Sequence, residues 1–378
     1  MRIYCLSHSP LPSERPASLQ VVRMSEAFAR LGHEVVLFGF RSARRSEDVH
    51  AFYDIDPTFR ILRFPRLRVR GIGMALFARR VHGACRKMGP PDLFVSREAY
   101  SMLACARFGV PFVYEAHVAP HSAVKRALEQ RLFGRPNFLG LVTNCNALRE
   151  YYLRTFPALD AARTLNAPSA ARTPQRYRAP SETGRDRSRL QVGYVGRLAE
   201  TRGIEIILEL AARNPDMDFH LLGGRAGEAE AWRRKVSVPN VEFPGFVAPR
   251  ELEEWYGRFD VVVAPYASRV ISRDHKWDLT PWMSPLKVVE AMAYGKALVC
   301  SDFPVLREFL THAVNAWLVA PDDLAGWNDA LRTLRDNPPV REDLGAQARS
   351  DFLAGHTYDG RARRVLDFIR RRMGQSGR

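Results

Sequence analysis

The sequence is poor in cysteine and lacks the motifs of several common enzyme classes. Its 378 residues contain five cysteines, and no C-x-x-C pair occurs. An odd number at wide spacing favours reduced, buried thiols in a cytosolic protein over a disulfide framework or a zinc site. No H-E-x-x-H or clustered Asp/His set is present, and no G-x-S-x-G nucleophile elbow, so metal-dependent hydrolysis and serine catalysis are poorly supported.

Long apolar runs are also missing. No run reaches the ~18–20 residues that a membrane-spanning helix needs. The opening MRIYCLSHSP has one basic residue and a short apolar stretch, so we expect a first strand there and no signal peptide. The loop after this strand lacks G-x-G-x-x-G, which argues against a nicotinamide cofactor. We therefore expect a cytoplasmic protein.

Acidic residues are too few to balance the basic ones. The chain has 57 Lys and Arg against 41 Asp and Glu, a formal net charge of +16. This excess favours anionic partners, which include nucleic acid, acidic lipid headgroups and phosphorylated substrates. The hydrophobic content of 46% is that of a globular protein, and the length predicts two domains.

Strand and helix patterns alternate along the chain in two series. The first covers 1–170, where RIYCLSH, SLQVVRMSEAFARLG and HEVVLFGF form a β-α-β unit and further strands are expected at FRILRF, DLFVS, FVYEAH and GLVTN. A polar, Pro- and Arg-rich segment at 171–189 predicts a linker. The second series covers 190–355 and includes helices expected at RGIEIILELAARNP, SPLKVVEAMAYG and FPVLREFL. A terminal helix is expected at 356–378. The pattern predicts an α/β protein with two Rossmann-like domains facing an interdomain cleft.

Two stretches of the second series place charge where parallel sheets bind ligands. In GYVGRLAETRG, a strand ends before Arg197, and Arg202 precedes the next helix. Two arginines at such an edge can clamp a diphosphate, although surface arginines in an Arg-rich chain explain the pattern equally well. In SPLKVVEAMAYG, Ser284 is expected as the N-cap with Pro285 as the first helical residue.

Two charged residues follow within that helix. Lys287 would oppose the helix dipole in the first turn unless an anion also lies there. Glu290, about a turn later, suits the diol of a ribose, and a solvated helix residue is the plainer alternative.

The first series offers a histidine and a basic segment. His117, near Glu115 and His121, follows a strand at its C-terminal end, where active sites of such sheets lie, although a lone histidine there is more often structural. Residues 57–91 contain no acid. A helix at 73–88 would carry an apolar face and a basic one, which makes four residues candidates for contact with an anionic membrane surface: Arg79, Arg80, Arg86 and Lys87. An ordinary solvated face explains them equally well. Interleaved aromatics for nucleic acid are lacking.

Together these stretches resemble the retaining GT-B glycosyltransferases of family four (glycosyl transferases group 1), over nearly the whole chain. The resemblance rests on the order of six segments: SLQVVRMSEAFARLGHEVVLFGFR, VYEAH, LVTNCNALREYY, GYVGRLAETRGIEIILELA, GFVAPRELEEWYGRFDVVVAPY and SPLKVVEAMAYGKALVCSDFPVLREFL. TYDGRARRVLDFIRRR is similar to the terminal helix, which in this fold packs back towards the N-terminal domain.

The resemblance implies a hexosyltransferase that uses a nucleotide-diphosphate sugar, with UDP- or GDP-sugars favoured and no metal or other cofactor. A glycan or lipid-linked saccharide would be the acceptor, and His117 would be catalytic. The donor diphosphate would be held by Arg197, Arg202, Ser284, Leu286 and Lys287, the ribose by Glu290, and the base near Gly223, Phe246 and Val247. No nucleic-acid partner is expected, and polysaccharide biosynthesis is the implied setting.

The sequence departs from the family pattern at three points. Trp282 stands where the E-x7-E motif has its first acid, Arg202 replaces a lysine, and PLPSERPAS replaces a Gly-rich loop. A nucleotide-sugar epimerase of the same fold, a degenerate transferase, and a non-enzymatic basic protein that binds membranes or nucleic acid therefore remain alternatives.

Overall fold

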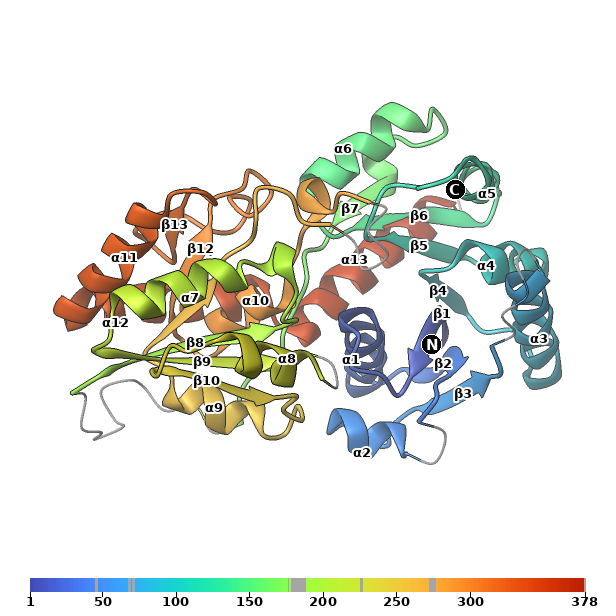
Figure 1. Ribbon diagram of the computed structural model, residues 1–378. Coiled ribbons are helices and arrows are strands. Elements are labelled where there is room, and N and C mark those ends of the chain that lie inside the picture. The colour runs from blue at the N-terminus through green and yellow to red at the C-terminus, as the bar shows by residue number, and fades with distance from the viewer. Residues whose placement is uncertain are drawn as a thin grey trace. The chain divides into compact units, whose positions relative to one another are not determined.

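The computed structural model describes residues 1–44, 47–66, 69, 72–175, 177, 188–224, 227–271 and 277–376. The chain divides into two compact units. Unit 1 comprises Met1–Pro168 and Tyr358–Arg378, and unit 2 comprises Ser169–Thr357. Each unit is a parallel sheet with helices on its faces (Figure 1).

Unit 1 contains a seven-stranded sheet in the order β3-β2-β1-β4-β5-β6-β7, and every pairing in it is parallel. Its strands are β1 (Arg2–Leu11), β2 (Glu34–Arg41), β3 (Arg60–Phe64), β4 (Leu93–Ser96), β5 (Phe112–Ala116), β6 (Phe138–Thr143) and β7 (Thr164–Asn166). Its α-helices are α1 (Pro16–Arg30), α2 (Val49–Tyr53), α3 (Ile72–Met88), α4 (Ala99–Cys105), α5 (Ala123–Phe133), α6 (Asn146–Thr155) and α13 (Tyr358–Ser376).

Unit 2 contains a six-stranded parallel sheet in the order β10-β9-β8-β11-β12-β13. Its strands are β8 (Leu190–Gly196), β9 (Met217–Gly223), β10 (Val241–Gly245), β11 (Val261–Ala264), β12 (Ala297–Ser301) and β13 (Trp317–Val319). Its α-helices are α7 (Ile204–Arg213), α8 (Glu228–Lys235), α9 (Leu252–Arg258), α10 (Leu286–Ala293), α11 (Leu324–Asp336) and α12 (Pro338–Gly355). Two short 3-10 turns, η4 (Glu200–Arg202) and η5 (Thr280–Trp282), lie near its C-terminal strand ends.

The central strands are apolar because helices cover both faces of each sheet. All four residues of β11 and all five of β12 are buried, as expected for parallel strands. The five cysteines are free and buried, which confirms the prediction of thiols that serve as small core residues.

The terminal helix α13 belongs to unit 1, where it packs against α1 and β6. Phe368 is 5% exposed and lies over Gly140 of β6 so closely that a Cβ at Gly140 would come within 2.5 Å of the phenyl ring. At the exposed end of the contact, Arg30 of α1 donates to Asp359 at 2.7 Å. The C-terminal helix is therefore part of the unit 1 core.

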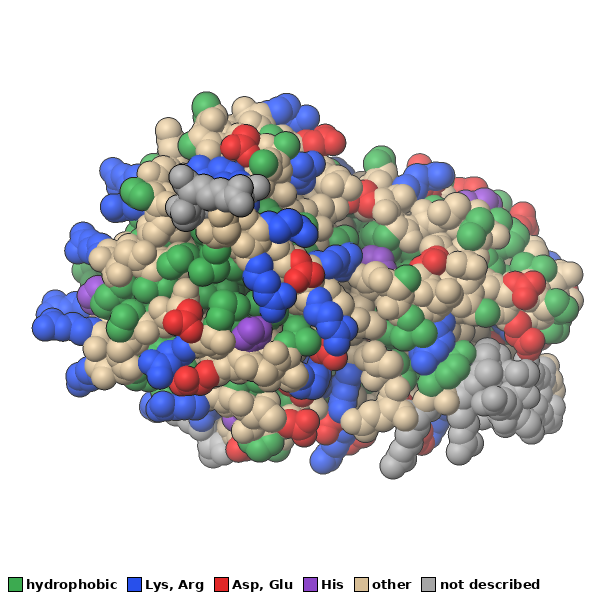
Figure 2. Space-filling model, turned by 180° about the vertical axis from the view of Figure 1, so that it is seen from behind, with side chains coloured by type: hydrophobic (Ala, Val, Ile, Leu, Met, Phe, Trp, Pro, Cys, Tyr) green, Lys and Arg blue, Asp and Glu red, His purple; other side chains and the backbone are tan. Residues whose placement is uncertain are grey.

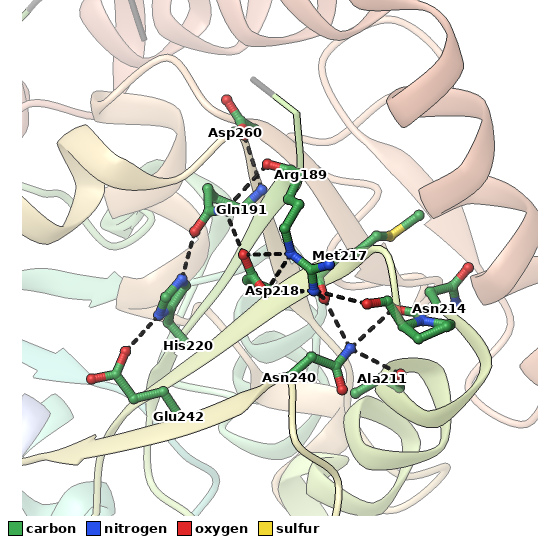
Figure 3. Close-up of polar contacts among 11 residues, drawn as sticks. Arg189, Gln191, Ala211, Asn214, Met217, Asp218, His220, Asn240, Glu242 and Asp260 are labelled. Atoms are coloured by element: carbon green, nitrogen blue, oxygen red, sulfur yellow. Dashed lines mark hydrogen bonds and ion pairs between the residues drawn. The ribbon is translucent and has the colours of Figure 1, made fainter. Parts of the chain in front are cut away.

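A polar network fixes the start of the unit 2 sheet (Figure 3). Arg189 donates to both carboxylate oxygens of Asp218, to the carbonyl of Pro215 in the turn before β9 and to that of Met217, the first residue of β9. His220 is held between Gln191, at 2.8 Å, and Glu242, at 2.8 Å. Except for His220, in the middle of β9, these residues lie at or next to the N-terminal ends of the strands, so the network anchors the sheet towards the edge opposite to the one where ligands collect.

Some expected elements differ in the structure. The helix predicted at 303–310 is wrong: the segment forms successive turns, in which Leu306 and Arg307 share the Phe303 carbonyl and Asp302 binds the Arg307 side chain. Four apolar residues of this segment face the core, which the turns achieve without a helix: Phe303, Val305, Leu306 and Leu310. Most of the predicted linker at 171–189, namely 176 and 178–187, lies outside the described residues.

Replacing Phe368 by alanine should destabilise unit 1 by about 3–5 kcal/mol, because it empties a closed site between α13 and β6. Replacing Arg370, whose side chain is exposed and pairs with Asp367 one turn away on the same helix, should change stability by less than about 1 kcal/mol. Denaturant unfolding of both variants measures the difference. Equal midpoints would contradict this assignment of α13 to the core.

Candidate functional site

The C-terminal edge of the unit 2 sheet is tightly built. Gly223, with φ of +108°, ends β9 beside the end of β8, and a Cβ there would come within 2.2 Å of the Gly196 carbonyl oxygen. The Gly224 N–H donates to that carbonyl at 3.0 Å. Only glycine fits this approach without moving the backbone. β10 lies next to β9 in the sheet, and the predicted base-binding residues Phe246 and Val247 follow directly after its last residue. Phe246 is 45% exposed.

The two predicted arginines lie in the segment that follows β8 at this edge. Arg197 directly follows the strand, and its side chain, 35% exposed, pairs with Glu228 at 3.8 Å. Arg202 ends the turn η4 and is followed by Gly203, which has φ of +70° and lies against Pro265 where a Cβ would clash at 2.7 Å. This close contact holds the turn that carries Arg202 against the loop after β11.

Lys287 lies between two tyrosine rings. Its Nζ is 4.3 Å from the ring centroid of Tyr194 and 4.1 Å from that of Tyr266. The Arg202 guanidinium lies over the same Tyr266 ring, at 5.8 Å. The Lys287 Nζ is buried and has no hydrogen-bond partner among the described residues. The structure thus brings the predicted residues Lys287 and Arg202 together beside the Tyr266 ring. Neither tyrosine was predicted from the sequence to belong to the site.

The charges in this cluster act on one another. Burial, and then the neighbouring Arg202 guanidinium, hold the pKa of Lys287 well below its ordinary value. Burial raises the pKa of Tyr194, and the positive charges of Arg202 and Arg197 partly offset that rise. We define Arg197, Arg202 and Lys287 as the cationic cluster. Because its members repel one another in a low-dielectric setting, an anion bound among them would relieve the repulsion.

The start of helix α10 differs from the prediction. Ser284 is not the N-cap: its hydroxyl accepts a hydrogen bond from the Ser169 N–H at 2.8 Å. Pro285 is the N-cap residue, with extended backbone, and Leu286 is the first helical residue. The Ser284 side chain is thus engaged with a distant segment, while Lys287 lies in the first turn as predicted.

Glu290 lies one turn later and faces an aromatic pair. Its carboxylate accepts a hydrogen bond of 3.4 Å from the hydroxyl of the buried Tyr256, which stacks on Tyr294 at 4.3 Å. Trp282 ends the turn η5 just before α10 and is half-buried. Asp278, the nearest upstream acid, binds Arg269 at 3.1 Å and caps the Thr280 N–H at 2.9 Å.

In unit 1, His117 directly follows β5 at the C-terminal edge of the sheet. Its Nε2 lies 2.5 Å from a carboxylate oxygen of Glu115, which is 7% exposed. Burial and the nearby Arg97 lower the pKa of His117 to about 4, against the opposing effect of Glu115. His117 is therefore neutral at neutral pH. Sequence reasoning missed Arg97, because a single arginine after a strand carries no distinctive signal.

The four basic residues predicted on helix α3 are not equivalent. Arg79, Arg86 and Lys87 are exposed, whereas Arg80 is half-buried and donates to the Pro65 carbonyl at 3.2 Å. On the face of the molecule drawn in Figure 2, Lys and Arg side chains lie at many separate places. Arg68 and Arg70 of the same basic segment lie outside the described residues.

Two features are missing from the described part of the chain. No helix there is long and apolar enough to cross a membrane. Within the same residues, no three His, Cys, Asp or Glu side chains gather as a metal site would require.

Comparison with known protein families and sequences gave matches in both halves of the chain. The model "Glycosyltransferase Family 4" matches residues 17–164, and "Glycosyl transferases group 1" matches residues 189–337. A D-inositol 3-phosphate glycosyltransferase of Pseudarthrobacter chlorophenolicus is 29% identical over 185 residues, which are 46% of this chain and 41% of that protein. The protein of the same name from Rhodococcus erythropolis is 26% identical over 296 residues, 68% and 63% of the two chains. The chain thus spans less than two thirds of either relative.

Solved structures match along the whole chain. Sucrose-phosphate synthase from Thermosynechococcus elongatus has a TM-score of 0.76 at 18% identity and covers 99% of both chains. Anabaena HepE, solved with UDP-glucose, has a TM-score of 0.72 at 16% identity and covers 98% of this chain and 99% of its own. At these identities the likeness establishes the fold.

Replacing Lys287 by methionine should stabilise unit 2 more at pH 7 than at pH 10. Lysine titrates near 10.4 in the unfolded chain. Below that pH the unfolded state binds a proton that native Lys287 binds less readily. The free energy of unfolding of the wild type therefore falls by about 1.4 kcal/mol for each unit by which the pH is lowered. Contact with two rings favours the ammonium by about 0.5–2 kcal/mol each, less than full burial can cost. Denaturant unfolding at both pH values measures the gain.

The matched control for that experiment is the exposed Lys87→Met, which should show no such pH dependence. A gain for Lys287→Met that does not change between pH 7 and pH 10 would mean that the native Lys287 keeps its proton as readily as the unfolded chain does.

Proposed function

The chain belongs to the family 4 glycosyltransferases and has their GT-B fold, and we propose that it moves a hexose from a nucleotide-diphosphate sugar to a glycan or lipid-linked saccharide with retention of configuration. The observation that carries this proposal is the cationic cluster at the C-terminal edge of the unit 2 sheet. A diphosphate is the ligand that best neutralises it.

The donor site in this proposal uses three kinds of group. The cationic cluster, with the N–H groups at the start of α10, binds the diphosphate and stabilises the charge that develops as it departs. Glu290 accepts hydrogen bonds from the ribose, in an orientation set by Tyr256. The base lies near Gly223, Phe246 and Val247. UDP- or GDP-sugars are the proposed donors, and the structures of Anabaena HepE in complex with UDP and with UDP-glucose support the first of these.

The acceptor in this proposal binds to unit 1. His117 contacts the transferred sugar or the attacking hydroxyl, and its neutral ring offers a hydrogen-bond acceptor there. Arg97 beside it favours an acceptor that carries an anionic group. The names of the curated relatives, which contain D-inositol 3-phosphate, support an acceptor of this kind.

A peripheral position at the inner face of the membrane is a further part of the proposal. It rests on the exposed Arg79, Arg86 and Lys87 of α3 and on the exposed Ile72, which is 61% accessible at the start of that helix. Such a helix can lie on anionic headgroups, which would bring the enzyme to lipid-linked acceptors.

Replacing Arg197 by alanine should abolish most transfer while the protein stays folded, because the diphosphate loses a bidentate partner. A thermal-shift panel of UDP, GDP, ADP and TDP sugars measures donor binding, and a ligand at ~100 times its dissociation constant should stabilise the wild type by about 2.7 kcal/mol. Arg213→Ala is the control, since Arg213 is exposed and pairs with Glu209 within its own helix. Unchanged turnover in Arg197→Ala would contradict the donor site.

Replacing Arg79, Arg86 and Lys87 together by glutamine should weaken binding to vesicles rich in anionic lipid. At about 1 kcal/mol per charge, the loss should be on the order of 100-fold. Sedimentation with vesicles measures it. The control replaces Arg233 and Arg234, which are exposed on α8 of unit 2, by glutamine. Equal binding by both variants would remove α3 from the proposal.

A further inference from the structure

A buried arginine of the C-terminal helix stands behind His117. The Arg361 side chain is 0% exposed, and its guanidinium donates to a Glu115 carboxylate oxygen at 3.0 Å. It also donates to the carbonyls of Ala167, at 3.1 and 3.2 Å, and of Pro168, at 3.0 Å. A fully buried cation is costly unless it is paired and hydrogen-bonded, and these contacts supply both conditions.

The same Glu115 oxygen that binds Arg361 also binds His117. The oxygen Oε1 lies 3.0 Å from the Arg361 guanidinium and 2.5 Å from the His117 Nε2. Burial alone would raise the pKa of Glu115, but Arg361, His117 and Arg97 together hold it well below its ordinary value. Glu115 is therefore a carboxylate that only accepts hydrogen bonds, so the His117 nitrogen facing it must carry the hydrogen.

We propose that Arg361 is a positioning residue for the transfer reaction: by keeping Glu115 as a fixed carboxylate, it holds the His117 ring with hydrogen on Nε2 and leaves Nδ1 as the acceptor. The proposal rests on the proposed role of His117. Arg361 touches neither reacting group and acts through Glu115 alone. Its position depends on Ala167 and Pro168, the last residues of unit 1 before the chain passes into unit 2.

Other charged and titratable groups surround Arg361, Glu115 and His117. They are Arg97, Tyr114, Cys5, Tyr358 and Arg364. Arg97 and Arg361 both oppose a proton on His117, whereas Glu115 favours one. Removing the charge of Arg361 therefore makes His117 easier to protonate, and a protonated ring has no acceptor nitrogen to offer.

The experiment is a pH titration of the His117 ring by NMR, with its signal assigned from a His117→Gln sample. In the wild type, we expect a neutral ring with hydrogen on Nε2 at pH 6–8. In Arg361→Met, the midpoint should rise by about one pH unit or more, and the preference for Nε2–H should weaken. Arg361→Lys, which keeps the charge, should restore the midpoint in large part.

Two further variants make the outcome decisive. Arg361→Gln, also neutral but able to bond one of the carbonyls, replaces Arg361→Met in case that variant does not fold. Arg370→Met, on the exposed face of the same helix, should leave the titration unchanged. A folded, neutral Arg361 variant with the wild-type midpoint and tautomer would overturn the proposal.

The titration needs neither donor nor acceptor, so its failure is distinct from failure of the proposed function. If no nucleotide sugar stabilises the wild type, the proposed function is wrong. The NMR titration of the His117 ring still tests the role of Arg361 in that case. With UDP as the probe, binding by the Arg361 variants should equal that of the wild type, because the donor residues all lie in unit 2.

Discussion

Parallel pairing is the constraint on which the other features of this structure depend. Parallel strands bring all their C-terminal ends to one edge of a sheet, and the helices on both faces leave that edge as the place for polar groups. In unit 2 the edge receives Arg197 from β8, Arg202 from the turn before α7 and Lys287 from α10. In unit 1 it receives Arg97 after β4 and His117 after β5.

Burial then determines how the basic side chains at these positions interact with their surroundings. Lys287 lies between two tyrosine rings and beside Arg202, and its buried amino group has no hydrogen-bond partner within the described residues. Arg361 is equally buried, but its Nε and one of its terminal nitrogens are hydrogen-bonded, to a carboxylate and two carbonyls. The first arrangement leaves binding free energy for an anionic ligand, whereas the second uses its charge to fix neighbouring side chains. In the proposed function, a buried basic side chain thus serves binding in unit 2 and positioning in unit 1.

Much of the fold could be predicted from the sequence because the buried strands are short apolar runs between clear breakers. LQVGYVG coincides with β8, and the expected strand DLFVS coincides with β4 to within one residue. The helix expected at 303–310 failed because its apolar spacing also suits a series of turns that bury the same side chains. Ser284 failed as a cap because its partner, Ser169, is 115 residues away and invisible to a local pattern.

The charged members of the candidate site could be predicted, but their surroundings could not. Arg197 is singled out by its place after a strand, and Lys287 because a cation in the first turn of a helix opposes the dipole. Tyr194 and Tyr266 resemble ordinary core aromatics, and only the folded arrangement places them around Lys287. Arg361 lies in an Arg-rich terminal helix, where nothing local separates one buried arginine from its exposed neighbours.

The proposed function depends on binding of the diphosphate of a nucleotide sugar by the cationic cluster of unit 2. Calorimetric titration with a nucleoside diphosphate and with the monophosphate of the same base tests it most directly, at two salt concentrations. If the cluster binds the diphosphate, the nucleoside diphosphate should bind at least about tenfold more tightly, which is about 1.4 kcal/mol, and salt should reduce this difference. Equal affinity for the two nucleotides would contradict it.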